Sequence, residues 1–196
     1  TLGPPNSFGS GNSQSVTQSG SGDSKVVTFE SEPGLVTPGI LILPKGEIKG
    51  VVIHMSDDGK AAEIARPSTL DPGYAHLYID GLGTGELAGI EMRYPIYAGR
   101  AVAFTAGWQI VRAAEAMRKY SSHIEIVGRG PMSSQAVMYA GLLDNQFAKV
   151  TGIGCMKSWM DAFQDNFNPI AVQPRAHLCG SLENLRKHVK NGEWRQ

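Results

Sequence analysis

A stretch in the second half of the chain has residue types and spacing that suit a reactive corner. Residues 124–141, IEIVGRGPMSSQAVMYAG, have the pattern of a buried strand, a tight glycine turn and then a helix. Many enzymes place a nucleophilic side chain at such a turn, where the backbone presents it to a substrate. Here the turn holds Gly130, followed by Pro131. Glycine has no side chain that could attack a carbonyl carbon, so the usual acylation step is not available at this position.

The corner is compatible with three interpretations. The first is a dinucleotide-binding fingerprint, because residues 128–133, GRGPMS, nearly match G-x-G-x-x-[GA]. That motif needs an acidic residue about 20 positions further on, and the next predicted strand ends in GIGCM (152–156) without one, so we predict no cofactor. The second is an elbow of the G-x-S-x-G type in which Gly130 and Met132 replace the serine and the last glycine. The third is a plain turn, in which the glycines serve only the backbone geometry.

Other residues near the corner and beyond it are weaker candidates for catalysis. Ser133 and Ser134 follow the corner closely, and we expect them in the first turn of the helix, although either could be a displaced nucleophile. His177 is a candidate acid–base residue, because Asp161 and Asp165 precede it in the acid-then-histidine order. Nothing in the sequence shows that either aspartate approaches His177.

Polar, glycine-rich segments follow three of the predicted strands. They are HMSDDGK (54–60), DGLGTGE (80–86) and GRGPMSS (128–134). The carboxyl ends of parallel strands meet at one edge of a sheet, where ligands bind, and we expect Asp80 to accept hydrogen bonds from the amides of its loop. No CxxC or HExxH pattern is present, so we predict no metal site. The candidate binding residues are His54, Ser56, Asp58, Asp80, Arg129 and Gly130.

The apolar pattern along the chain predicts the elements that position these residues. Two β-rich runs separated by a Glu-Pro-Gly turn signal predict an antiparallel hairpin, and later runs alternate between strands and helices. The fold class predicted from this order is α/β, with a doubly wound, mostly parallel sheet and an antiparallel N-terminal hairpin. The predicted strands are 25–31, 35–44, 50–55, 74–80, 124–127 and 149–156, and the predicted helices are one short helix within 56–73, then 102–120 and 133–144.

The two ends of the chain differ from its centre. Residues 1–24 contain twelve Gly or Ser and almost nothing to bury, which predicts a flexible linker or tail before a domain over 25–196. Beyond Met156 the pattern weakens, and residues 181–196 read as one final exposed helix with no further strong strand. We therefore expect the C-terminal part of the sheet to be incomplete within this chain.

Five segments follow one another at intervals that resemble a known family. They are FESEPGLVTPGILILP, VVIHMSDDGK, YAHLYIDGLGTGE, AGRAVAFTAGWQIVRAAEAMRKY and IEIVGRGPMSSQAVMYAGLLD, which together cover about residues 28–156. Their order is similar to that of the α/β-hydrolase superfamily, in its branch of acetyl-xylan-esterase-like carbohydrate esterases. That branch typically has a loop like Asp-Arg-Gly-x-Gly-Glu after a strand, and here residues 80–86 have Leu82 where arginine is common. HLCGSLENLRKHV (177–189) resembles the helix that precedes the next core strand of that family.

The resemblance implies a catalytic machinery that this sequence lacks in part. The family's nucleophilic serine maps to Gly130, and its acid and histidine follow two further strands that the sequence does not predict. Its oxyanion donors would come from the backbone near residues 55–56 and from Pro131, and proline has no N–H. We therefore expect a degenerate elbow, and the sequence leaves open whether the protein is an enzyme.

Composition limits the partners and the compartment. Lys+Arg and Asp+Glu are balanced at 18 each, which gives no indication of nucleic-acid binding, and no apolar run approaches the roughly 20 residues that span a bilayer. A Gly/Ser-rich head of this kind often joins the modules of secreted proteins, so we predict a secreted or cell-envelope location. Cys155 and Cys179 either form a disulfide or are two buried thiols.

Three functional hypotheses remain from the sequence. The main one is a pseudoenzyme related to carbohydrate acyl esterases, with a carbohydrate or another protein domain as its partner. An aromatic rim of Trp159, Phe163 and Phe167 would suit stacking on sugar rings. The alternatives are an active acetyl xylan esterase that uses displaced residues or a further C-terminal segment, and a structural domain of a larger envelope or filament protein.

Overall fold

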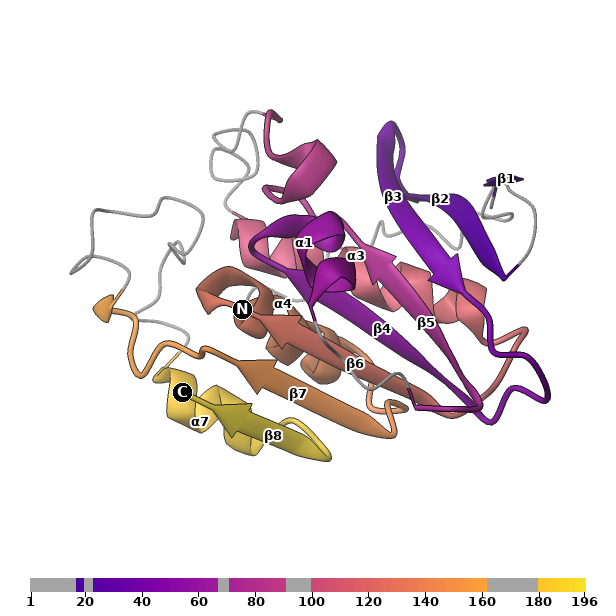
Figure 1. Ribbon diagram of the computed structural model, residues 1–196. Coiled ribbons are helices and arrows are strands. Elements are labelled where there is room, and N and C mark those ends of the chain that lie inside the picture. Colours follow the sequence, from indigo (N-terminus) through magenta and orange to yellow (C-terminus); the bar gives the residue numbers. More distant parts are fainter. Residues whose placement is uncertain (1–16, 20–22, 67–70, 91–99, 162–179) are drawn as a thin grey trace.

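The chain folds around one eight-stranded sheet, shown in Figure 1. The computed structural model describes residues 17–19, 23–66, 71–90, 100–161 and 180–196. The strand order across the sheet is β1-β2-β3-β5-β4-β6-β7-β8. The strands are β1 Thr17–Ser19, β2 Ser24–Glu32, β3 Leu35–Ile42, β4 Gly50–Ser56, β5 Tyr74–Ile79, β6 Ile124–Arg129, β7 Lys149–Ile153 and β8 Gly192–Arg195. The helices are α1 Gly59–Ala65, the 3-10 turn η1 Gly85–Leu87, α3 Val102–Met117, α4 Pro131–Leu143 and α7 Leu182–Lys187.

The pairing of the strands confirms the predicted fold class. Strands β1, β2 and β3 are joined by antiparallel pairing, and β3 also runs antiparallel to β5. From β5 through β4, β6 and β7 to β8 all pairs are parallel. Parallel strands need crossover connections, and the helices α1, α3, α4 and α7 supply them.

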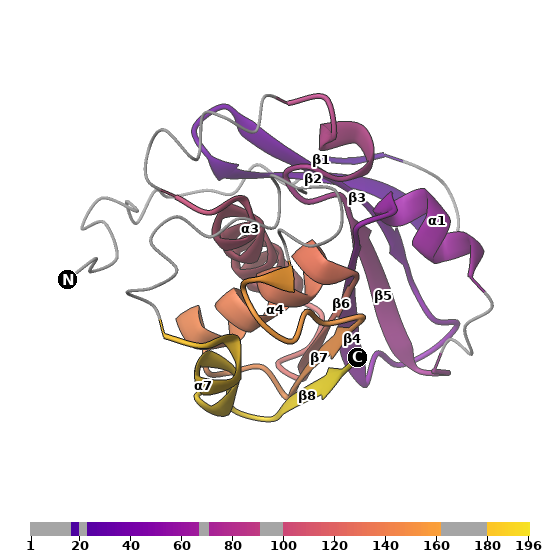
Figure 2. The same cartoon turned by 90° about the vertical axis from the view of Figure 1, so that its left-hand side faces the viewer.

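Helices cover the two faces of the sheet unequally. In Figure 2 the helices α3, α4 and α7 lie on one face of the sheet, and α1 lies on the other. The side chains of Val51, Ile53 and Met55 alternate along β4 and are buried in the main hydrophobic core. In α3, Ala106, Ile110 and similar apolar residues at helical spacing are buried in the same core, as the sequence pattern predicts.

The C-terminal region corrects two predictions. The single helix predicted over 181–196 is wrong, because α7 ends at Lys187 and β8 follows. Asn191 adopts a left-handed conformation with φ 57°, which turns the chain out of the helix and into the strand. Strand β8 then pairs with β7 in parallel, so the expectation that no strand follows 149–156 is also wrong. The Asn191-Gly192 step is a turn signal, and it interrupts the helical pattern of this segment.

The N-terminal stretch contributes a short strand to the sheet. Strand β1 lies within the region 1–24 that the composition predicts as a linker, and Gln18 pairs with Val27 of β2. The described part of the chain contains no helix long and apolar enough to cross a membrane.

Candidate functional site

The corner after β6 is tied to both neighbouring strands. Gly130 is the residue before the first turn of α4 and has φ 101°, a conformation that only glycine adopts readily. Its N–H donates to the carbonyl of Ile153 at the end of β7, at 2.8 Å. On the other side, the N–H of Asp57 donates to the carbonyl of Arg129, at 2.9 Å. The corner is therefore a rigid turn at the carboxyl edge of the parallel strands.

Asp57 fills the N-terminus of α4. Its two carboxylate oxygens accept hydrogen bonds from the backbone N–H groups of Met132 and Ser133, at 3.0 and 2.7 Å. The first N–H groups of a helix have no partner within the helix and attract a negative charge. Burial raises the pKa of Asp57, against the hydrogen bonds from Ser133 and Met132, which lower it. A side chain of the protein itself thus occupies the anion-binding position of this helix.

Asp57 and Gly130 leave no room for a side chain at the corner. A Cβ atom added to Gly130 would lie 2.5 Å from Cγ and 2.6 Å from Oδ2 of Asp57. Contacts under about 3 Å do not occur between real Cβ atoms and their neighbours, so a nucleophilic residue would require Asp57 to move. The glycine and the carboxylate are therefore a matched pair.

The two serines after the corner are buried in the first turn of α4, as predicted. Their exposed fractions are 0% for Ser133 and 1% for Ser134. The hydroxyl of Ser134 donates to the carbonyl of Pro131, at 3.1 Å. A nucleophile must reach a bound substrate, and neither hydroxyl is accessible in this arrangement.

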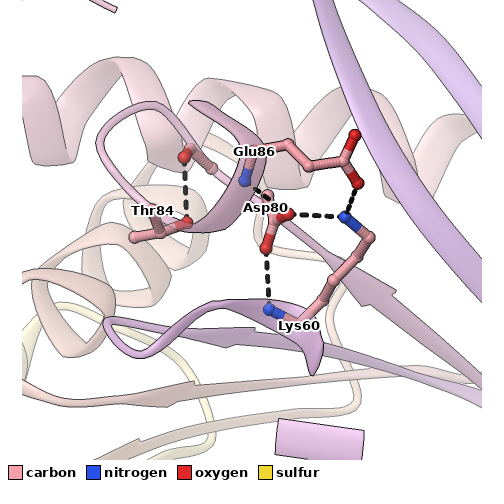
Figure 3. A network of polar contacts seen from close by, with 5 residues as sticks. Lys60, Asp80, Thr84 and Glu86 are labelled. Atoms are coloured by element: carbon pink, nitrogen blue, oxygen red, sulfur yellow. Dashed lines mark hydrogen bonds and ion pairs between the residues drawn. The ribbon is translucent and has the colours of Figure 1, made fainter. Parts of the chain in front are cut away.

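Asp80 is the centre of a buried polar network, drawn in Figure 3. Its carboxylate accepts a hydrogen bond from the N–H of Glu86 at 3.0 Å, an amide of its own loop as predicted, and a second from the N–H of Lys60 in α1 at 2.7 Å. The Lys60 ammonium lies 2.5 Å from Asp80 Oδ2 and also pairs with the Glu86 carboxylate. Burial alone would lower the pKa of Lys60, but the hydrogen bonds to Asp80 and Glu86 raise it.

The loop after β5 wraps closely around this carboxylate. Gly85 has φ 47°, and a Cβ there would lie 2.2 Å from Asp80 Cγ. The hydroxyl of Thr84 donates to the carbonyl of Gly81, at 2.9 Å, which closes the loop on itself. The network therefore holds η1 and the start of α1 together, and its charges are satisfied within the protein.

His54 is paired with a second histidine away from the corner. Its Nε2 lies 3.0 Å from Nδ1 of His76, and its ring stacks on that of Tyr78, with centroids 4.5 Å apart. Burial, with smaller contributions from His76 and Arg129, lowers the pKa of His54 to about 3, so this ring is neutral at ordinary pH. The contacts of His54 are those of a partly buried, packed and hydrogen-bonded structural residue.

The remaining predicted binding residues make local structural contacts. The Ser56 hydroxyl accepts a hydrogen bond from the N–H of Asp58, at 3.3 Å. Asp58 pairs with Arg66 near the surface, and Arg129 donates through Nε to the Glu63 carboxylate on α1, at 3.0 Å. Of the six predicted binding residues, only Gly130 therefore lies at the N-terminus of α4, where Asp57 binds the first amides of the helix.

Asp57 is a residue of the corner that is not among the predicted binding residues. It lies in the SDDG segment directly after β4, beside the predicted residue Asp58. The register of β4 and β6 pairs Ser56 with Arg129, so the next residue on each strand faces the other. The sequence does contain a signal for this role. Asp57 comes one position after a strand, and the neighbouring strand leads directly into a helix whose N-terminus attracts a negative charge.

Several predicted residues lie outside the described part of the chain, among them His177, Asp165, Phe163, Phe167 and Cys179. Within the described part, Cys155 is buried and Asp161 accepts hydrogen bonds from the N–H groups of Lys157 and Ser158. No group of three or more His, Cys, Asp or Glu in these same residues is placed to bind a metal ion.

Comparison with solved structures identifies the architecture. A 2,6-dihydroxy-pseudo-oxynicotine hydrolase matches with a TM-score of 0.60 and 13% identity, covering 92% of this chain and 52% of that one. An α/β-hydrolase from Penicillium sp. sh18 matches with a TM-score of 0.53 and 15% identity, covering 70% of this chain and 47% of that one. The fold is α/β-hydrolase-like. An acetyl xylan esterase from Paenibacillus sp. R4 has the same α/β-hydrolase-like arrangement, with a TM-score of 0.58, 14% identity, and coverage of 81% of this chain and 58% of that one.

These similarities are distant. The chain spans about half of the length of the α/β-hydrolase-like structures it matches. No protein-family model matches the sequence, and no curated protein matches it.

Proposed function

We propose that this chain is a non-catalytic α/β-hydrolase-like module, related to carbohydrate acyl esterases, that serves a binding or assembly role outside the cytoplasm. The observation that supports it best is the Asp57 carboxylate at the N-terminus of α4, bound to the amides of Met132 and Ser133. It sits against Gly130, the position at which a serine hydrolase of this fold would present its nucleophile.

Ester hydrolysis on this fold needs a nucleophile and free oxyanion donors. Gly130 offers no attacking atom, and Pro131 has no N–H to donate. The next two amides of α4 already donate to Asp57, so a substrate oxygen would have to displace a carboxylate from them. The nucleophile and the oxyanion donors of α4 are therefore both missing at the same corner, for separate physical reasons.

The relation to carbohydrate esterases rests on the order of the segments and on the distant likeness to an acetyl xylan esterase. The loop over 80–86 keeps the acidic ends and the glycines of that branch, but Leu82 replaces the common arginine and is 2% exposed. An apolar, buried residue at this position supports a structural role for the loop over a role in contacting a ligand. We propose a carbohydrate, or a neighbouring protein domain, as the partner, and a secreted or cell-envelope location from the Gly/Ser-rich head.

The first experiment measures ester hydrolysis. The purified protein is assayed with p-nitrophenyl acetate and with acetylated xylan, beside an active acetyl xylan esterase, and is then treated with a fluorophosphonate probe and analysed by mass spectrometry. We expect no turnover above the buffer rate and no labelled serine. A kcat/KM on the order of 10⁴ M⁻¹s⁻¹, within the ordinary range of enzymes, would overturn the proposal.

Two variants make that experiment specific. Ser133→Ala and Ser134→Ala remove the two hydroxyls in the first turn of α4, at positions where alanine suits a helix. If hydrolysis were observed and either variant abolished it, a displaced serine would be the nucleophile and the protein would be an enzyme.

The second experiment tests the ligand class. Affinity electrophoresis compares migration in gels with and without soluble acetylated xylan, with Trp159→Ala as the variant. Trp159 is partly buried and its Nε1 donates to the carbonyl of Gly180, at 2.7 Å. We expect retardation of the protein and a weaker effect for the variant, since aromatic rings stack on sugar rings. Unchanged migration in xylan gels would overturn the carbohydrate part of the proposal.

A further inference from the structure

A pocket of about 430 Å³ lies at the amino ends of β4 and β5. It is lined by the segment that joins β3 to β4 and by the turn that precedes β5, which meet at the lower right in Figure 1. Ligands of parallel α/β sheets usually bind at the opposite edge, where the strands end, so this pocket is separate from the corner at Gly130. A cavity of about 150 Å³ holds benzene, and the pocket is therefore large enough for a small aromatic molecule.

The walls of the pocket are mainly apolar. Five of the residues that line it have aliphatic or ring side chains: Ile42, Leu43, Pro44, Pro72 and Tyr74. Ligand pockets in proteins combine walls of this kind with a small number of polar groups that orient the ligand. The walls therefore favour a ligand that is apolar over most of its surface.

The charges around the mouth of the pocket are balanced. Lys45 and Lys49 contribute two positive charges, and Glu47 and Asp71 contribute two negative charges. All four residues are exposed, so water screens their fields. Such a rim selects neither an anion nor a cation, which favours a neutral ligand.

His76 brings a buried polar group to this pocket. The residue is 6% exposed and lies opposite Ile42 in the pairing of β3 with β5. Its Nδ1 lies 3.0 Å from Nε2 of His54, whereas its own Nε2 is buried and has no hydrogen-bond partner among the described residues. Buried polar atoms in folded proteins are nearly always hydrogen-bonded, so Nε2 of His76 is an attachment point for a ligand.

The protonation state of His76 limits which group pairs with it. Burial lowers the pKa of His76, against the nearby backbone and charge of Asp71, which raise it, so the ring is neutral at ordinary pH. In a neutral ring, Nε2 carries the proton if His54 donates to Nδ1, and it is an acceptor if Nδ1 donates to His54. A hydroxyl group both donates and accepts, and therefore pairs with Nε2 in either state.

We propose that this pocket binds a neutral phenol, with the aromatic ring against the apolar walls and the hydroxyl hydrogen-bonded to Nε2 of His76. A sugar fits less well, because most of its hydroxyls would lie against apolar walls without a partner. The pocket and the corner at Gly130 lie at opposite edges of the sheet, so this inference does not depend on whether that corner is catalytic.

The test compares p-cresol with toluene, which has the same ring and methyl group but no hydroxyl. Each is titrated into isotope-labelled protein and followed by heteronuclear NMR. For p-cresol we expect a Kd of about 1 mM, as suits so small a ligand, with amide shifts centred on residues 42–49 and 71–76 and a shift of the Nε2 signal of His76. Toluene should bind about fivefold more weakly, because it cannot make the hydrogen bond. Methyl β-D-xylopyranoside should give no saturable shift at these residues.

Two variants separate the hydrogen bond from the apolar walls. His76→Phe keeps a ring but removes Nε2, so p-cresol and toluene should then bind with Kd values within about twofold of each other. Ile42→Trp places a larger side chain beside His76, in a strand that tolerates aromatic residues, and should weaken both ligands about tenfold or more. Val26→Trp is the matched control: Val26 is 52% exposed on the same face of the sheet but does not line the pocket, so the Kd should not change.

Three results would overturn the proposal. The first is the absence of a saturable shift at residues 42–49 and 71–76 with p-cresol up to about 10 mM, tenfold above the expected Kd. The second is equal affinity of the wild type for p-cresol and toluene, which would remove the hydrogen bond to His76. The third is unchanged p-cresol binding by a folded Ile42→Trp variant, which would place the ligand outside this pocket.

Discussion

Gly130 and Asp57 face each other so closely that a Cβ on Gly130 would lie 2.5 Å from Cγ of Asp57. The absence of a side chain at the corner is what allows the carboxylate to reach the amides of α4. The two residues therefore depend on each other: a side chain at position 130 would displace the Asp57 carboxylate from these amides, and the carboxylate leaves no room for a side chain at position 130.

Gly130→Ser is expected to destabilise the protein strongly. The serine would adopt a positive φ, at a cost of about 1–3 kcal/mol, and would also clash with Asp57. We expect the free energy of unfolding, measured by urea denaturation at neutral pH, to fall by roughly 3 kcal/mol or more. An Asp57→Ala background removes the two closest atoms, Cγ and Oδ2, and leaves only Cβ, at 2.8 Å, so the same substitution should cost about 1–2 kcal/mol less there. Equal costs in the two backgrounds would contradict the contact between the two residues.

Asp57→Asn is expected to change how stability depends on pH. Burial raises the pKa of Asp57 above its ordinary value of 3.8, so the folded state holds the proton more tightly than the unfolded state. The contribution of this group is fully present below pH 3.8 and is lost as the pH rises through the folded-state pKa. The difference in unfolding free energy, wild type minus variant, should therefore fall as the pH rises from 3.8 through the folded-state pKa and then level off. A difference that rises over this range would show the opposite shift.

Lys60→Met is expected to be among the most damaging single substitutions. Asp80 is 1% exposed, and removing the ammonium leaves its carboxylate buried without a counter-charge, at a cost of roughly 3–5 kcal/mol. Glu86→Gln serves as the control, because the Glu86 side chain is 66% exposed and an exposed pair contributes about 0–1 kcal/mol. Thermal and urea unfolding of both variants would check that Lys60→Met loses more unfolding free energy than Glu86→Gln. A similar loss of unfolding free energy for both would argue against the central role of Asp80.

His54→Gln is expected to make the protein less sensitive to acid. The folded-state pKa of His54 is lowered from 6.5 to about 3, so the neutral ring contributes stability above pH 6.5 that is lost as the pH falls towards 3. A glutamine does not titrate, so the variant should lose less stability than the wild type between those values. Unfolding free energies measured from pH 7 to about 4 would show the difference, and parallel curves would contradict it.

Much of the fold was predictable because its elements have strong local patterns. Buried runs such as residues 50–55 and the apolar spacing of the helix from Val102 indicate a parallel sheet covered by helices. The role of Asp80 was also predictable, since a carboxylate at the end of a buried strand, before closely spaced glycines, faces loop amides. The short strand β8 was missed because four residues have no period of their own, and their pairing depends on β7.

The sequence by itself determined that the corner has no nucleophile, because neither Gly130 nor Pro131 carries a reactive side-chain group in any conformation. Only the tertiary structure decided that the Asp57 carboxylate lies at this corner. The hydrogen bonds that bring Asp57 to Met132 and Ser133 join residues 75 and 76 positions apart in the chain. Such a contact follows from the register of β4 against β6, which is set by the packing of the whole sheet.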